Sequence, residues 1–225
     1  MSIGFIAAAA EIGTKIAEIA KVSEAKLHEI ISEAAQESVR EISKFSLEKM
    51  ELDVEALKKP ELPGHNVENS ARVLETFLKE ERINYYFETP LKREEMLCQL
   101  GENILSALDI QDKGIKIIFK EMPPNSYGVY NHSERTLTIN QRFIENPELL
   151  RDAIDTIIHE ARHAYQHCAV ETFTNSESYI WAGNFRSYIR PEWDFEDYEK
   201  QPVEVDARNF AASVVEKALN NILYG

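Results

Sequence analysis

Cysteine is scarce in this sequence of 225 residues, which contains only Cys98 and Cys168. Two thiols cannot supply the disulfide framework that holds many small secreted domains together. They would allow a single bridge, but a reducing compartment is the simpler explanation. The chain is long enough to fold around a good-sized hydrophobic core instead.

A long apolar run is also missing. The apolar stretch at residues 3–10 is too short to span a bilayer, which takes about 20 apolar residues. No lysine or arginine precedes it, so it also lacks the basic start of a signal peptide. We therefore expect a cytoplasmic protein without membrane insertion, and export by a specialised route stays open.

Basic residues are in the minority, because 25 lysines and arginines stand against 39 aspartates and glutamates and give a net charge of −14. An acidic surface of this kind repels nucleic-acid phosphates and anionic lipids, so both are poor partners. It accepts divalent cations and basic peptides.

Residues 1–58 are predicted to be helical throughout. Apolar residues recur there at spacings that are mostly three and four, which is the pattern of one helix stripe. They are Ile12, Ile16, Ile19, Val22, Leu27, Ile30, Ala34, Val39, Ile42 and Phe45. A coiled coil, a helical hairpin or an oligomerisation arm would fit, so this segment is a candidate to bind a second copy of the chain or a partner helix. Prolines at 60 and 63 break the pattern, and we place a helical module at 1–62 and a second domain at 63–225.

The second domain is predicted to belong to the α+β class, mostly helical with a small, mainly antiparallel sheet. The expected elements are helices at 67–87, after Thr89-Pro90, after Asn146-Pro147 and after Gln201-Pro202, and strands at 115–119, 127–130 and 136–140. The last two strands form a predicted hairpin, and the sheet is expected to pack on the helix that follows Asn146. Residues 171–201 are expected to be irregular.

The helix after Asn146 carries the motif His159-Glu160-Ala161-Arg162-His163. Residues four apart lie one above the other on a helix face, so the two imidazoles can bind one tetrahedral Zn²⁺. Glu160 neighbours the first histidine and faces the open coordination position, where it can take a proton from zinc-bound water. The motif lies on an apolar helix just after a hairpin, which is the context that zinc chemistry requires.

A catalytic zinc usually has three protein ligands, so a third is needed. Three histidines at 159, 163 and 167 would span about 12 Å along one helix, too far for one ion. We therefore expect His167 beside the site rather than in it, and Cys168 in the core as a thiol.

Glu204 is the favoured third ligand, because it lies in the first turn of the last helix and can approach the histidines from a separate element. Asp206 is the competitor. It lies about 200° further around the same helix, so the two carboxylates cannot face one ion. Asp206 is then expected to orient a histidine N–H.

The order of these features resembles the gluzincin branch of the zincin metallopeptidases: a strand hairpin, an HExxH helix, and a helix that opens with Glu-x-Asp-Ala-x-x-Phe-Ala. The sequence is particularly similar to short zincins of bacterial mobile elements, prophages and secreted toxin systems, and more distantly to membrane CAAX-processing proteases. The resemblance covers about residues 115–215.

The resemblance implies His159, His163 and Glu204 as zinc ligands and Glu160 as general base. It also implies that an edge strand before the active helix, 136–140 or 127–130, binds extended peptide by strand addition. The sequence departs from the family where many gluzincins have an acid four residues after the ligand glutamate, since that position is Arg208.

Together these features predict a zinc-dependent metallopeptidase that hydrolyses a protein or peptide substrate with zinc-activated water and Glu160 as the base. The residue that stabilises the oxyanion is open among Tyr188, Arg190, Tyr198 and His167. The alternative is an interaction or structural protein of a mobile element or toxin system. In that protein, residues 1–58 would perform the function and the zincin domain would be degenerate.

Overall fold

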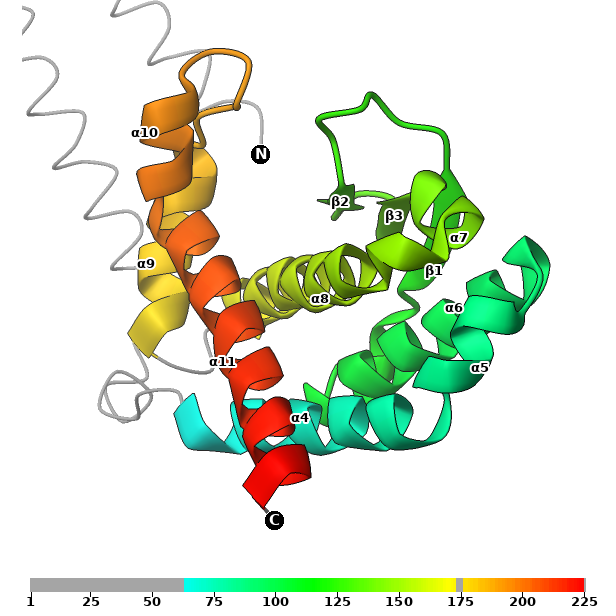
Figure 1. Cartoon of the computed structure of the whole chain (residues 1–225). Helices are drawn as coiled ribbons and strands as arrows, with labels where there is room; N and C mark the ends of the chain where they lie inside the picture. Colours follow the sequence, from blue (N-terminus) through cyan, green and yellow to red (C-terminus); the bar gives the residue numbers. More distant parts are fainter. Residues whose placement is uncertain (1–62, 173–175, 225) are drawn as a thin grey trace, which may run out of the picture. The chain divides into compact units, whose positions relative to one another are not determined.

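The computed structural model describes residues 63–172 and 176–224. The predicted helical module at residues 1–62 and its oligomerisation role lie outside the described residues. Those that are described confirm the α+β class, because helices dominate and a three-stranded sheet accompanies them (Figure 1).

Three helices open the described chain: α4 (Pro63–Glu80), α5 (Arg82–Phe87) and α6 (Pro90–Ala107). The helical block expected at 67–87 consists of two helices, α4 and α5. The start of α6 agrees with the sequence prediction, since the Thr89 hydroxyl accepts a hydrogen bond from the Lys92 backbone N–H at 3.3 Å and Pro90 occupies the first turn.

The sheet contains β1 (Lys116–Lys120), β2 (Gly128–Asn131) and β3 (Thr136–Asn140) in the order β1-β3-β2. The antiparallel β2–β3 hairpin is confirmed, but β1 pairs with β3 in parallel, so the sheet is mixed rather than mainly antiparallel. The central position goes to the strand with the most buried surface: four of the five residues of β3 are buried, whereas β1 alternates between exposed and half-buried. A central strand is paired on both sides, so 136–140 cannot be a substrate-binding edge, and β2 lies at an edge.

The long helix α8 (Leu150–Thr172) lies at the centre of the domain. A short helix α7 (Arg142–Glu145) and a 3₁₀ turn η2 (Pro147–Leu149) lead into it, and the Asn146 side chain caps that turn by accepting from the Glu148 N–H at 3.1 Å. The predicted inward face of α8 is buried: Leu150, Ile154, Ile157, Ile158 and Ala161. This face packs against α6 and the sheet, which confirms the predicted contact between sheet and helix.

Residues 171–201 are not irregular as expected, because they contain α9 (Ser176–Arg186) and α10 (Phe195–Lys200). Packing of single large side chains, rather than a long apolar stripe, stabilises this part: Trp181 is buried in a small core cluster with Ala169 and Val203. The final helix α11 (Pro202–Tyr224) begins where the sequence predicted, and it crosses α8 and packs on α4 (Figure 1).

Two further findings bear on function. Of the helices in the described ranges, none combines the length and the apolar character that crossing a bilayer requires.

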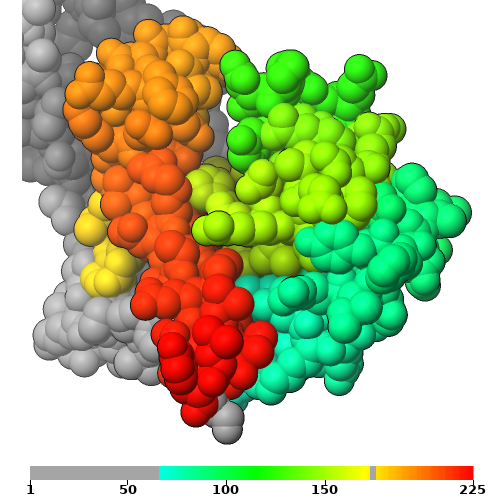
Figure 2. Space-filling view, viewed as in Figure 1, coloured from blue at the N-terminus to red at the C-terminus, as the bar shows by residue number. Residues whose placement is uncertain are grey.

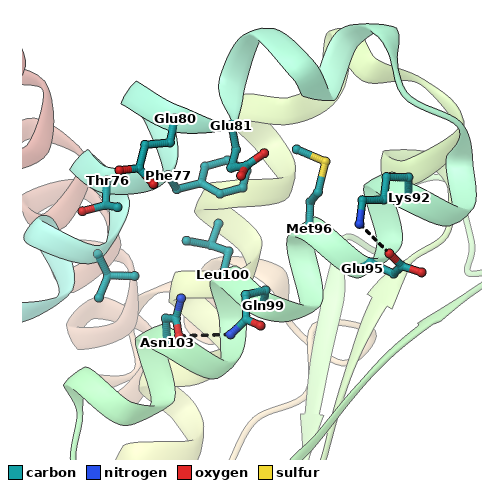
Figure 3. Close-up of a pocket in the computed structure, with 11 residues that line it drawn as sticks. Thr76, Phe77, Glu80, Glu81, Lys92, Glu95, Met96, Gln99, Leu100 and Asn103 are labelled. Atoms are coloured by element: carbon teal, nitrogen blue, oxygen red, sulfur yellow. Dashed lines mark hydrogen bonds and ion pairs between the residues drawn. The ribbon is translucent and has the colours of Figure 1, made fainter.

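A pocket of about 560 Å³ lies between α4 and α6 (Figure 3). It is lined by Phe77, Met96 and Leu100 and by polar side chains that pair with one another, such as Lys92 with Glu95. It is separate from the histidine motif, whose residues do not line it.

Candidate metal centre

Two helices bring the predicted ligand residues together. The side chains of His159 and His163 lie one turn apart on α8, and Glu204 reaches them from the first turn of α11. These three residues offer ligand atoms that all lie within 4.8 Å of one another. Within the described ranges, no other group of histidine, cysteine, aspartate and glutamate side chains has this arrangement.

The proposed ligand atoms have spacings close to those around a tetrahedral zinc ion. The Nε2 atoms of His159 and His163 are 3.0 Å apart, Oε2 of Glu204 lies 3.6 Å from Nε2 of His159, and Oε1 of Glu204 lies 3.5 Å from Nε2 of His163. Ligands of a tetrahedral zinc at bond lengths near 2.05 Å are about 3.3 Å apart. The residues therefore fit a zinc ion with only small adjustments.

The Glu204 carboxylate has the environment of a ligand rather than of a surface acid. Its side chain is 2% exposed, and Oε2 has no hydrogen-bond partner among the described residues. Burying a charged oxygen in this way is costly unless a cation or a donor compensates it. A bound metal ion would provide that compensation.

The electrostatics of the cluster agree with a cation site. Burial alone would raise the pKa of Glu204, but the rings of His159 and His163 and the Tyr188 hydroxyl hold it well below its ordinary value. Burial alone would lower the pKa of His163, yet the carboxylates of Glu204 and Glu160 outweigh it and raise the pKa to about 9. In the absence of metal the histidine thus takes up a proton, which provides the positive charge that the buried carboxylate requires.

Glu160 is buried on α8 beside the cluster, under the edge strand. The contact between strand and helix is close at Gly128 of β2: a Cβ atom there would lie 2.7 Å from Cγ2 of Thr156 and 3.1 Å from Cγ of Glu160. Only glycine leaves room for β2 to approach the helix at this point. No local sequence signal predicts this role of Gly128, because it arises only when the strand lies on the helix.

Two of the four candidates for oxyanion stabilisation lie at the cluster. Tyr188 donates a hydrogen bond to Oε1 of Glu204 at 2.7 Å, and the ring of Tyr198 lies 6.2 Å from that of Tyr188. Burial, and then the Glu204 carboxylate, raise the pKa of both phenols well above the usual value. Both therefore stay protonated and can donate hydrogen bonds.

The other two candidates lie elsewhere. The His167 ring is stacked between those of His132, at 4.3 Å, and Phe185, at 3.9 Å, so it is a neighbour of the site and not part of the cluster. Exposed Arg190 lies over the Trp193 ring at 5.3 Å.

The remaining ligand candidates are also assigned by their contacts. Both cysteines are free thiols, and Cys168 is a buried core residue as expected. Asp206 does not face the histidines; it pairs with Arg162 at 2.8 Å. The side chain that contacts a histidine nitrogen is instead that of Gln166, whose Oε1 lies 2.9 Å from Nδ1 of His163.

Figure 2 shows a hollow between α10, in orange, and the chain on either side of β2, in green, with residues of α8 at its base. The helix that carries His159 and Glu160 and the edge strand thus border an opening that an extended chain could enter.

Comparison with known proteins adds no assignment: no family model matches this sequence, and neither a curated protein nor a solved structure is significantly similar to it.

Proposed function

We propose that this protein is a zinc-dependent metallopeptidase. The observation that carries the proposal is the convergence of His159, His163 and Glu204 from two helices, with a buried carboxylate oxygen that has no other partner among the described residues. Zinc held by these three side chains would supply a Lewis acid that polarises a carbonyl and makes a bound water more acidic.

The chain's own residues supply the other parts of peptide hydrolysis. Glu160, next to the ligand His159 and buried under β2, would accept a proton and deliver it to the leaving amine. The protonated phenol of Tyr198 would stabilise negative charge as it develops on the carbonyl oxygen. The single O–H of Tyr188 is already donated to Oε1 of Glu204, so Tyr188 would support the ligand carboxylate instead.

The sheet offers a place where a peptide substrate could bind. β2 is an edge strand directly over the helix with the motif, and the side of β2 away from β3 has no strand in the described ranges. An extended peptide could add to that edge by main-chain hydrogen bonds and pass the cluster. The net charge of −14 favours basic peptides.

The test compares wild type with Glu160→Gln on an unfolded basic polypeptide, with zinc content measured on both. The glutamine keeps the size of the side chain but cannot accept a proton, so cleavage should fall by a factor on the order of 10²–10⁴ while zinc stays bound. Equal cleavage by both proteins would exclude Glu160 as the base. A wild type that holds zinc but cleaves none of a broad peptide library would instead favour the interaction protein.

A further inference from the structure

The side chain of Gln166 is fully buried on α8, one turn after His163. Its Nε2 donates two hydrogen bonds to α11, one to the Val203 carbonyl oxygen at 2.9 Å and one to Oδ2 of Asp206 at 2.7 Å. Both partners are acceptors only, so the amide nitrogen must face them. The reverse orientation would place Oε1 against a carboxylate oxygen.

This orientation decides the protonation of the neighbouring histidine. Oε1 of Gln166 faces Nδ1 of His163 at 2.9 Å, and an amide oxygen can only accept. Nδ1 therefore carries a proton. In the neutral ring Nε2 then has the free lone pair, and Nε2 is the atom that points to His159 and Glu204.

The partner of the amide is itself held rigidly. The side chain of Arg162 is 3% exposed, and its guanidinium donates two hydrogen bonds to the Asp206 carboxylate, at 2.8 Å and 3.1 Å. The rings of Tyr165, Trp181 and Phe210 surround the guanidinium at 4.7–5.3 Å. Arg162 compensates the negative charge of Asp206, and the Gln166 amide lies between that carboxylate and the imidazole of His163. The ring is therefore contacted by a neutral group.

The contacts of Gln166 on α11 also flank a ligand. Val203 directly precedes Glu204 near the start of that helix, and Asp206 follows Glu204 two residues later. One buried amide thus restrains the ring of His163 and the turn that carries Glu204. Contacts of this kind commonly raise metal affinity by 10- to 100-fold.

We propose that Gln166 is a positioning residue for the metal centre, which fixes the Nδ1–H form of His163 and docks the Glu204 turn of α11 on α8. The inference rests on the proposed zinc site, but its geometric part can be tested without metal.

The first measurement is the exchange of the His163 Nδ1 proton with water, followed by NMR in the metal-free and the zinc-treated protein and assigned by its loss in His163→Ala. In wild type the proton should be protected, because the bond to Gln166 is buried whether or not metal is present. An Nδ1 proton that exchanges as fast as that of a solvent-exposed histidine overturns the proposal without any Gln166 variant.

The second measurement is zinc affinity by chelator competition. Gln166→Met keeps the length of the side chain but removes the acceptor and both donors. It should weaken zinc binding about 10- to 100-fold and expose the Nδ1 proton. Tyr85→Phe is the matched control, since it removes one buried hydrogen bond, from the hydroxyl to the Phe143 carbonyl oxygen at 2.9 Å, away from the cluster. It should lower stability and leave both zinc affinity and the Nδ1 proton unchanged.

Gln166→Glu separates the two parts of the role. It retains an acceptor for His163 but loses both donors and places a carboxylate against Asp206, so it should keep the protected proton and still weaken zinc binding. Wild-type zinc affinity in this variant refutes the docking of the Glu204 turn, and wild-type affinity in Gln166→Met refutes the whole proposal. Failure of wild type itself to bind zinc would refute the proposed function, whereas proton protection would still report on Gln166.

Discussion

Gly128→Ala adds one carbon atom, Cβ, at the contact between the edge strand β2 and the helix α8. The new Cβ would lie 2.7 Å from Cγ2 of Thr156, 3.1 Å from Cγ of Glu160 and 3.2 Å from the Thr138 carbonyl oxygen. The first distance is shorter than packed side chains tolerate. Thr156 cannot readily rotate away, because it is buried and its hydroxyl donates to the Asp152 carbonyl oxygen at 2.7 Å.

The clash should therefore push β2 and α8 apart. Overpacking of this kind costs about 1–3 kcal/mol, which corresponds to a drop in melting temperature of about 2–12 °C for a protein of this size. Hydrolysis should fall as well, since the displaced strand and Glu160 belong to the proposed substrate and proton-transfer contacts. Zinc affinity should change little, because Glu160 is not one of the three proposed ligands.

The assay is thermal unfolding together with cleavage of an unfolded polypeptide, with two companion variants. Thr156→Ser on the Gly128→Ala background removes the methyl group that is struck at 2.7 Å but keeps the hydroxyl. It should recover stability while the 3.1 Å contact with Glu160 keeps cleavage low. Gly183→Ala is the control, because a Cβ at this helical position meets nothing within 4 Å.

The reasoning is refuted if Gly128→Ala melts at the wild-type temperature, or if the serine substitution recovers no stability. A loss in Gly183→Ala as large as that in Gly128→Ala would also contradict it, since alanine at an open helical site should stabilise by up to about 1 kcal/mol.

Three further outcomes follow from the site. Tyr188→Phe removes the hydrogen bond to the Glu204 carboxylate, worth about 1.5–3 kcal/mol, so zinc affinity measured by chelator competition should fall about 10- to 100-fold; an unchanged affinity refutes that role. Tyr198→Phe should keep zinc affinity and lose hydrolysis on the order of 10²-fold, and the reverse pattern in a cleavage and zinc-binding comparison would contradict the assignment. Burial, with two neighbouring histidines, lowers the pKa of His167 from 6.5 to about 3, so the unfolded chain takes up a proton that the folded chain refuses. The free energy of unfolding of the metal-free protein should thus fall as pH falls from about 6.5 towards 3. His167→Phe keeps a ring in the stack but cannot take up the proton, so its free energy of unfolding should fall less steeply over this pH range. Equal slopes for the two proteins would contradict this role of His167.

Local signals predicted the elements that carry the site. The apolar stripe at Leu150, Ile154 and Ile158 predicts the inward face of α8, which is confirmed. Asn146-Pro147 predicts the start of a helix, but it caps the 3₁₀ turn η2, and α8 begins three residues later at Leu150. Helix geometry alone also excluded His167 from a cluster with His159, because the distance along the helix is fixed by its rise.

Contacts between segments that are distant in the sequence could not be predicted from local signals. Gln166 meets Val203 and Asp206 only because α11 crosses α8, and these partners lie 37 and 40 residues later in the sequence. Its position three residues after His163 was the only available hint, since such residues share a helix face. The role of Gly128 likewise depends on the strand lying on α8.

The departures in the fold have similar causes. The parallel pairing of β1 with β3 depends on which strand is buried at the centre, which a three-strand pattern does not specify. Residues 171–201 form two helices without a long apolar stripe, because single buried rings such as Trp181 hold them.

The most direct test of the central claim is diffraction at the zinc absorption edge from crystals of the protein purified with zinc. We predict one anomalous peak per chain within about 2.0–2.2 Å of Nε2 of His159, Nε2 of His163 and a carboxylate oxygen of Glu204. A peak bonded to His167 with Glu204 turned away, or no peak between the two helices in fully zinc-treated crystals, would contradict the account.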